Sequence, residues 1–132
     1  MHFKYPKKEK LCSKILIGKL FENSNRIRKY PLTLLWISDE LPAQVPVQSA
    51  ISVSKKRFRK AVTRILLKRR IREAFRLNKN DLYEQLMSYN KQVALMIIYQ
   101  SNDILPYANI EKSMKILFTD LSHKLSLLDN SH

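Results

Sequence analysis

Acidic residues are scarce in this chain. Lys and Arg number 25 against 11 Asp and Glu, which gives a formal net charge of +14 over 132 residues. Such an excess of one sign repels itself in a folded protein, so we expect it to serve a polyanionic partner. Nucleic acid is the favoured partner for a short basic chain with a globular apolar pattern, and an anionic membrane surface is the competing interpretation.

Cysteine, glycine and histidine are also rare. The single cysteine, Cys12, excludes an intramolecular disulfide, and we expect it to be a small buried side chain on the first helix. The three histidines have no metal-ligand spacing relative to Cys12. No apolar run approaches the roughly 20 residues of a membrane span, and no secretory signal is recognisable. We therefore expect a cytoplasmic protein with a single domain over residues 1–132.

The apolar pattern predicts an α+β fold, an α/β sandwich with a small mixed sheet and the element order α-β-β-α-β-α. A further strand around residues 43–47 is an open alternative. We expect a loose basic arm over residues 1–10, helices at 11–22, 60–77, 81–87 and 110–128, strands at 26–37, 47–54 and 93–99, loops at 38–46 and 100–109, and a frayed tail at 129–132.

Two of these segments have the clearest patterns. In the strand at 47–54, Val47, Ile51 and Val53 point to one face, and the opposite face is small and polar. The last helix carries an apolar stripe at spacings of three and four residues, formed by Ile110, Met114, Leu117, Phe118, Leu121, Leu125 and Leu128.

The most informative segment is a dense cationic run. Between Lys55 and Arg72 there are ten basic residues and no acidic one. Apolar residues give the run a buried helix edge at i, i+4, i+7 and i+8, formed by Leu67, Ile71, Ala74 and Phe75. Positive charge on a rigid helix, rather than on a disordered tail, suits a polyanion of defined shape such as structured RNA.

The same run resembles the protein subunit of bacterial ribonuclease P. In that family a strand ends in Ser-Val-x-Lys-Lys and leads to Ala-Val-x-Arg-Asn-Arg-x-Lys-Arg-x-x-Arg-Glu on a helix. The matching residues here are Ser52, Val53, Lys55, Lys56, Ala61, Val62, Arg64, Lys68, Arg69, Arg72 and Glu73. The specific motif is confined to about residues 52–76, whereas the order of elements agrees over most of the chain.

The resemblance implies a fold like the second domain of ribosomal protein S5, with the basic helix in a β-α-β crossover. That crossover is left-handed in the family, although the general rule is right-handed. It also implies a ribonucleoprotein that removes the 5′ leader of precursor tRNA, with the hydrolytic centre and Mg²⁺ in the RNA subunit. The eleven acids fit this, because they form no cluster of the kind that metal-assisted phosphodiester cleavage needs.

The expected partners are therefore ribonuclease P RNA and precursor tRNA, with neither a membrane nor DNA. The expected RNA-binding residues are Lys55, Lys56, Arg57, Arg59, Lys60, Arg64, Lys68, Arg69, Arg72 and Arg76. A groove between the first helix and the sheet is expected to hold the leader. Its candidate residues are Phe21, Ile17, Ser52 and Ser54, with core packing of Phe21 as the alternative.

One departure from the family pattern bears on the fine contacts. The family's Arg-Asn-Arg sequence is Arg64-Ile65-Leu66 here. Ile65 and Leu66 can neither donate hydrogen bonds nor ligate a cation, so we transfer no such contact and no metal role to them. The family's other aromatic, one helical turn before Phe21, corresponds to Ile17.

Two other functions are compatible with the basic content alone. One is a different structured-RNA binder, such as a ribosomal protein. The other is a helix-turn-helix DNA binder that uses residues 60–77 as its recognition helix. A helix-turn-helix needs a short helix immediately before the recognition helix, whereas the sequence predicts a strand there.

Overall fold

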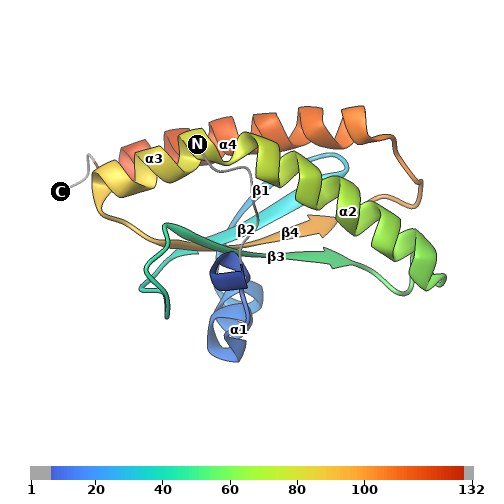
Figure 1. Cartoon of the computed structure of the whole chain (residues 1–132), viewed down its shortest axis with the longest axis horizontal. Coiled ribbons are helices and arrows are strands. Elements are labelled where there is room, and N and C mark those ends of the chain that lie inside the picture. Colours follow the sequence, from blue (N-terminus) through green and yellow to red (C-terminus); the bar gives the residue numbers. More distant parts are fainter. Residues whose placement is uncertain (1–6, 130–132) are drawn as a thin grey trace.

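The protein folds into a four-stranded sheet with helices on both faces (Figure 1). The structure is a computed structural model and describes residues 7–129. Its elements are the 3-10 helix η1 (Lys7–Glu9), α1 (Lys14–Glu22), β1 (Asn25–Lys29), β2 (Leu32–Ser38), β3 (Val47–Val53), α2 (Ala61–Asn78), α3 (Asn80–Tyr89), β4 (Val93–Tyr99) and α4 (Tyr107–Asp129).

The sheet is mixed, as the sequence predicts. Its strand order is β1-β2-β4-β3. The pairs β1–β2 and β2–β4 are antiparallel, whereas β3 and β4 are parallel. Parallel neighbours need a crossover connection, which α2 and α3 provide. The β-α-β unit through the basic helix is therefore confirmed, and its left-handed course stays a prediction.

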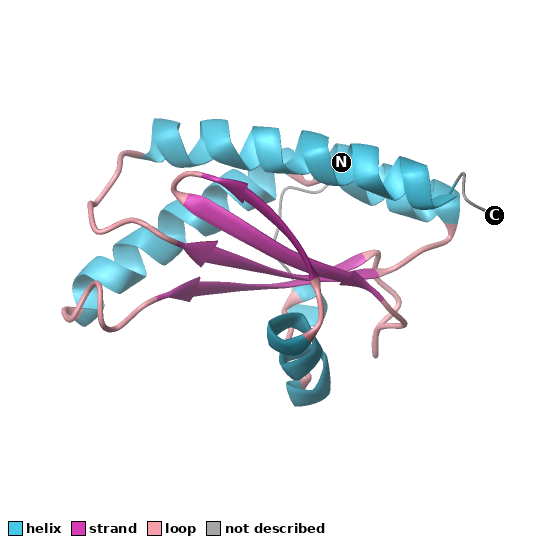
Figure 2. Cartoon of the chain, turned by 180° about the vertical axis from the view of Figure 1, so that it is seen from behind, coloured by secondary structure: helices cyan, strands magenta, loops and turns pink. Residues whose placement is uncertain are grey.

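The two faces of the sheet carry unequal layers. Helices α2, α3 and α4 lie together on one face, and α1 lies alone on the other (Figures 1 and 2). The apolar run of β4 is buried between them, because alternate residues point to the two layers: Leu95 and Ile97 belong to the cluster under α2 and α4, and Ala94 and Met96 to the cluster under α1. The expected central strand is confirmed.

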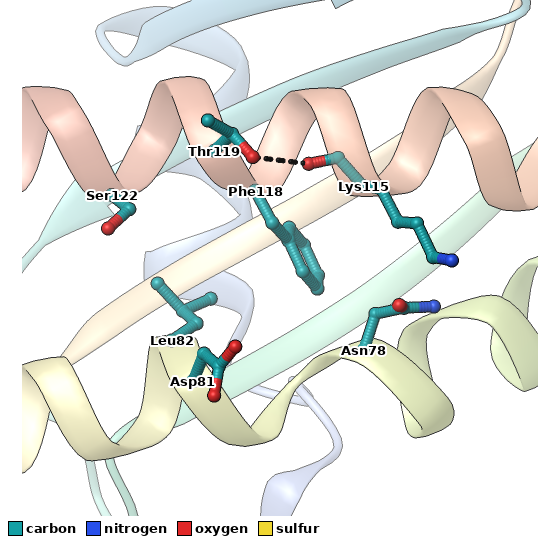
Figure 3. A pocket seen from close by; sticks show the side chains of 7 residues that line it. All are labelled: Asn78, Asp81, Leu82, Lys115, Phe118, Thr119 and Ser122. Atoms are coloured by element: carbon teal, nitrogen blue, oxygen red, sulfur yellow. Dashed lines mark hydrogen bonds between the residues drawn. The ribbon is translucent and has the colours of Figure 1, made fainter.

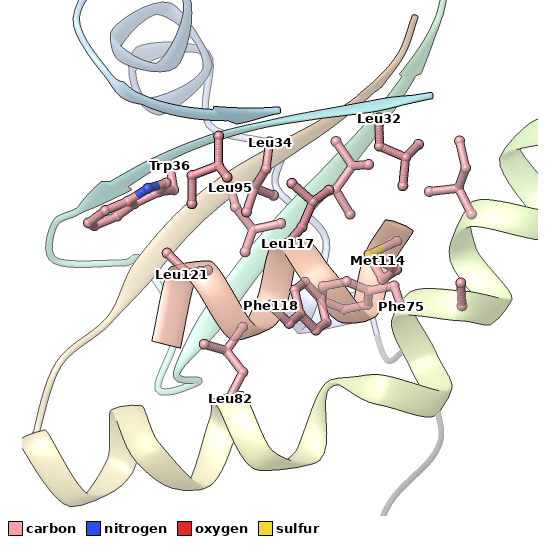
Figure 4. Packing of buried hydrophobic residues seen from close by; sticks show 14 of the residues in the cluster. Leu32, Leu34, Trp36, Phe75, Leu82, Leu95, Met114, Leu117, Phe118 and Leu121 are labelled. Atoms are coloured by element: carbon pink, nitrogen blue, oxygen red, sulfur yellow. The ribbon is translucent and has the colours of Figure 1, made fainter. Parts of the chain in front are cut away.

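The larger core lies between the sheet and the three helices (Figure 4). Phe75 of α2 packs edge-on against Phe118 of α4, with ring centroids 5.6 Å apart. The expected edge of the basic helix is confirmed, since Leu67, Ile71, Ala74 and Phe75 are fully buried. The stripe of α4 is buried from Ile110 to Leu125. Leu128 is instead exposed, because it lies in the last turn, beyond the part of the helix that packs on the core.

In the first half of the chain one expected strand is wrong, and the expected loop at 38–46 is confirmed over the alternative of a further strand. The segment expected as one strand at 26–37 is a hairpin, in which Tyr30 and Pro31 form a two-residue turn with a cis peptide bond. Residues 43–46 form no strand. Leu41 and Val45 from that loop instead bury their side chains in the smaller cluster, next to α1.

The described part of the expected N-terminal arm is ordered. Glu9 is buried, Lys10 bridges to Ser49 of β3, and the Gln48 amide donates to the Lys8 carbonyl at 2.9 Å. Residues 7–10 are thus fixed along the edge of the sheet, whereas residues 1–6 of the arm and 130–132 of the tail lie outside the described residues. Cys12 is exposed rather than buried, because it precedes the first turn of α1.

Candidate RNA-binding site

The loop between β3 and α2 presents five of the expected RNA-binding residues. Lys55, Lys56, Arg57, Arg59 and Lys60 are all exposed. The loop itself is fixed at two points. Ser54 Oγ accepts the backbone N–H groups of Lys56 and Arg57 at 3.1 and 3.4 Å. Phe58 is buried against Tyr99 of β4, with ring centroids 5.8 Å apart. These contacts fix the loop backbone, so the cationic side chains extend from a backbone of defined conformation.

Two arginines of this region also hold the protein together. The Arg64 guanidinium donates to the backbone carbonyls of Phe58 and Arg59 at 2.7 and 3.0 Å, which closes the loop onto the first turn of α2. Arg57 donates to Asn102 Oδ1 at 2.9 Å, in the loop before α4. A guanidinium has five N–H donors, so each side chain retains donors for a phosphate.

The start of α2 adds positive potential. Its first turn contains no acidic residue, and its N-cap residue Lys60 makes no capping bond through its side chain. The aligned peptide dipoles leave a partial positive charge at this end of the helix, where acids are usually favoured. Cations in that place raise the free energy of the isolated protein and lower that of a complex with phosphate. The arrangement favours an anionic partner.

The middle of α2 carries the remaining expected cations. Arg69 and Arg72 are exposed and Lys68 is half-buried, on the side away from the core residues Leu67 and Ile71. Two apolar side chains lie on the same exposed side: Val62 is 78% exposed and Ile65 is 57% exposed. The exposed side of α2 is therefore cationic, and it carries a small apolar area, Val62 and Ile65, in the first turns of the helix.

Arg76, at the end of the helix, differs from the other cations. It forms an ion pair with Glu73, with Nη2–Oε1 and Nε–Oε2 distances of 2.5 and 3.2 Å. The hydrogen bond from Arg76 lowers the pKa of the Glu73 carboxyl, and the same bond raises the pKa of Arg76. Glu73 is the one acidic residue between Lys55 and Asn80. Glu73 thus neutralises the positive charge of Arg76, whereas no acidic residue lies in the sequence from Lys55 to Arg72.

The expected leader residues lie on the α1 face of the sheet, with one difference. Ser52 lies in a row across the sheet with Ile98, Thr33 and Arg28, as the strand register shows. Ile17 packs beside the smaller cluster, next to this face. Ser54 differs from the other three residues, because its hydroxyl oxygen already accepts the backbone N–H groups of Lys56 and Arg57. Phe21 is 58% exposed, which excludes the alternative that it is a core residue.

Sequence reasoning missed two cations on that face. Arg26 and Arg28 are exposed on β1, and they alternate with Ile27, which is buried on the α4 side. Because directly paired residues share a face, Arg28 lies with Thr33 and Arg26 with Leu35, next to α1. The alternation of Arg26, Ile27 and Arg28 could have indicated two cations on one face of a strand. It places them on an edge strand next to α1 only when the β1–β2 hairpin is known.

A hollow of about 390 Å³ lies on the opposite face, between the α2–α3 junction and α4 (Figure 3). Its polar lining residues are Asn78, Asp81, Lys115, Thr119 and Ser122, and none of them belongs to the expected site. Within residues 7–129, no three His, Cys, Asp or Glu side chains gather where they could hold a metal ion.

The structure also bears on two alternatives, a helix-turn-helix DNA binder and a protein that crosses a membrane. The basic helix α2 follows strand β3 through the loop at residues 54–60, so no helix precedes it in the way that a helix-turn-helix requires. None of the helices in the described part of the chain combines the length and hydrophobicity of a bilayer-crossing segment.

Comparison with known proteins places this geometry in a family. The family model for ribonuclease P matches residues 5–122. Ribonuclease P protein components from Porphyromonas gingivalis and Chlorobaculum tepidum are 31% and 30% identical to the chain, over 86% and 95% of its length and 82% and 83% of theirs.

Solved structures agree in fold. The Staphylococcus aureus RNase P protein superimposes with a TM-score of 0.66 at 17% identity, covering 86% of this chain and 94% of that one. The Thermotoga maritima RNase P protein gives a TM-score of 0.63 at 19% identity, covering 85% and 96%. The family match over most of the chain and the shared fold lead to one conclusion: the chain belongs to the ribonuclease P protein family, the protein subunits of this tRNA-processing ribonucleoprotein.

Proposed function

We propose that the β3–α2 loop and the outer side of α2 bind the ribonuclease P RNA directly. The observation that carries the proposal is the exposed, acid-free cationic surface from Lys55 to Arg72, mounted on a helix whose other side is fully buried. Rigid cations can match the phosphates of a folded RNA without first being ordered, so less conformational entropy is lost on binding. The residues that take part are those expected from the sequence, with Arg76 contributing least because of Glu73.

The α1 face of the sheet is proposed to hold the 5′ leader of precursor tRNA. Single-stranded nucleic acid is bound by exposed aromatics on which bases stack and by cations that follow the backbone. Phe21 is such an aromatic, and Arg26 and Arg28 on the edge strand supply the charge. Ile17 lies beside the smaller cluster under α1, and Ser52 lies on β3, at the edge of the sheet opposite β1.

Hydrolysis is assigned in this proposal to the RNA subunit with bound Mg²⁺. The protein would contribute by screening phosphates and by positioning the substrate, which lowers the Mg²⁺ concentration that the assembly needs. The whole chain would act as one RNA-binding domain. Its cytoplasmic location stays a prediction.

Reconstitution with the cognate ribonuclease P RNA tests the proposal. Precursor-tRNA cleavage is measured at low Mg²⁺ with and without the protein, and cleavage is expected to be faster with it. A protein carrying Lys124→Ala, a charge change at an exposed position near the end of α4 and outside the residues of the proposed surface, should behave as the unaltered protein. Equal cleavage rates with and without the protein would show that the assignment is wrong.

A further inference from the structure

The β1–β2 turn and the start of α4 line a hollow of about 390 Å³. The turn and the start of α4 lie at the end of the molecule where the chain enters α2 (Figure 2). The lining of the hollow includes Lys29 from the end of β1, Tyr30 from the turn, and Asn109, Lys112 and Ser113 from α4. Both lysines are exposed. None of these residues belongs to the cationic run, to the motif that identifies the family or to the proposed leader surface.

Tyr30 combines exposure with a fixed position. Its side chain is 63% exposed, yet its hydroxyl lies 2.7 Å from Ser101 Oγ, and Ser101 is buried. Its backbone carbonyl accepts a hydrogen bond from Ser113 Oγ at 2.6 Å. A ring held at its tip and at its backbone presents a ready surface to a nucleobase, because little side-chain entropy remains to be lost.

The charges around the hollow favour phosphate. Asp103 is the only acidic residue in segments 26–38 and 99–110. Glu111, next to Lys112, is turned toward other partners, since its carboxylate accepts the Tyr107 hydroxyl at 2.9 Å. Lys29 and Lys112 form no ion pair among the interactions found in the described residues, so both ammonium groups can reach a ligand at the rim.

The hollow is also coupled to the basic helix. Two arginines donate hydrogen bonds to the loop between β4 and α4. Arg57 donates to Asn102 Oδ1 at 2.9 Å, and Arg70 of α2 donates to the Leu105 carbonyl at 2.6 Å. The same loop is fastened to Tyr99, whose hydroxyl donates to the Asp103 carbonyl at 2.6 Å and accepts the Leu105 N–H at 3.1 Å. The hollow therefore keeps a fixed position relative to α2. Part of its lining belongs to α4, and α4 lies on the same face of the sheet as α2, opposite α1 (Figures 1 and 2).

We propose that this hollow binds an unpaired nucleotide of the ribonuclease P RNA, with the base against Tyr30 and the flanking phosphates on Lys29 and Lys112. The RNA subunit is the chosen occupant because the hollow is fixed to the proposed RNA-binding helix rather than to the proposed leader surface. The inference rests on the proposed function and adds a second, separate anchor for the same RNA.

The test compares dissociation constants for ribonuclease P RNA over a range of salt concentrations. The double variant Lys29→Ala/Lys112→Ala should weaken binding about tenfold at low salt and reduce the salt slope by about 1.4, which is about 0.7 for each phosphate that is no longer neutralised. Tyr30→Ala should weaken binding about tenfold without changing the slope. Tyr30→Phe, which keeps the ring and its backbone anchor but loses the hydroxyl bond to Ser101, should weaken binding less than Tyr30→Ala.

The control is Lys124→Ala, which removes one lysine charge from an exposed position of the helix that carries Lys112. If the unaltered protein does not bind the RNA, the proposed function fails and the hollow with it. If Arg69→Ala and Arg72→Ala weaken binding while the double lysine variant behaves as Lys124→Ala, only the hollow proposal is wrong. Effects confined to precursor-tRNA binding by the assembled complex would equally overturn it, because they would identify a different occupant.

Discussion

Glu9 and Lys79 form a buried ion pair although they lie 70 residues apart in the chain. The Nζ–Oε1 distance is 2.9 Å, and Lys79 is only 2% exposed. The Tyr83 hydroxyl donates a second hydrogen bond to the same carboxylate oxygen, and its ring centroid lies 5.1 Å from the ammonium. The pair fastens the segment before α1 to the junction of α2 and α3. It thereby ties the N-terminal segment, next to the sheet edge, to the end of the basic helix.

Removing one partner of this pair should be costly, because the other charge would stay buried without compensation. Lys79→Met is expected to lower the free energy of unfolding by about 3–5 kcal/mol. The double variant Glu9→Gln/Lys79→Met should recover part of that loss. Lys19→Met provides the control: its ion pair with Asp39 is also 2.9 Å long but exposed, so its loss should cost under about 1 kcal/mol. Denaturant unfolding measures all three, and equal losses for the two lysines would contradict this account.

The parts of the fold that sequence could predict are those with a sustained apolar period. The stripe of α4 and the buried edge of α2 repeat over several turns, so each position supports the others. The hairpin was missed because the strand-forming residues continue on both sides of Tyr30 and Pro31, and only the proline marked the turn. The ordered N-terminal segment was missed because Glu9 and Lys79 reveal their pairing only in three dimensions.

The candidate RNA-binding site also has a part that the sequence predicts and a part that it does not. The cationic side of α2 follows from residue spacing alone. The contacts that fix it do not, since Arg57 meets Asn102 at a separation of 45 residues and Arg70 meets Leu105 at 35. Phe21 was ambiguous between core and surface until its exposure was known, because an aromatic at the end of an amphipathic helix suits either place.

Arg69→Ala and Arg72→Ala should each weaken binding to ribonuclease P RNA and reduce its salt dependence. Each exposed guanidinium that neutralises one phosphate contributes about 0.7–0.9 to the slope of log K against log salt. Stability should hardly change, because both side chains are exposed. Titrations at several salt concentrations measure the slope, and a slope equal to that of the unaltered protein would remove these residues from the interface.

Restoring the family residues at the centre of the motif should strengthen RNA binding. The double variant Ile65→Asn/Leu66→Arg supplies the hydrogen-bond donors that the aliphatic side chains lack. Ile65 is 57% exposed, so its replacement should leave the core intact. Val62→Asn, at a position 78% exposed on the same helix, controls for a general effect of polarity. An affinity no higher than that of the Val62→Asn variant would show that this chain does not use these two positions as its relatives' pattern suggests.

The Glu73–Arg76 pair gives a pH-dependent prediction. The hydrogen bond from Arg76 holds the pKa of Glu73 below its ordinary value of 4.5. The pair's contribution to stability is therefore fully present above that ordinary value and is lost as the pH falls through the lowered pKa. Glu73→Gln should lower the thermal midpoint at pH about 7, and the difference should vanish at pH about 2. A difference that persists undiminished in acid would assign the effect to packing rather than to charge.

Phe21→Ala should weaken binding of precursor tRNA to the assembled complex and leave binding of the RNA subunit unchanged. The ring is 58% exposed, so its removal costs little stability, while loss of one stacked base reduces affinity by about tenfold. Ile17→Phe, one helical turn earlier, adds an aromatic beside it and should strengthen the same binding. Substrates with and without a 5′ leader distinguish the contact: the Phe21→Ala effect should appear only with the leader present, and an equal effect on both substrates would place Phe21 outside the leader surface.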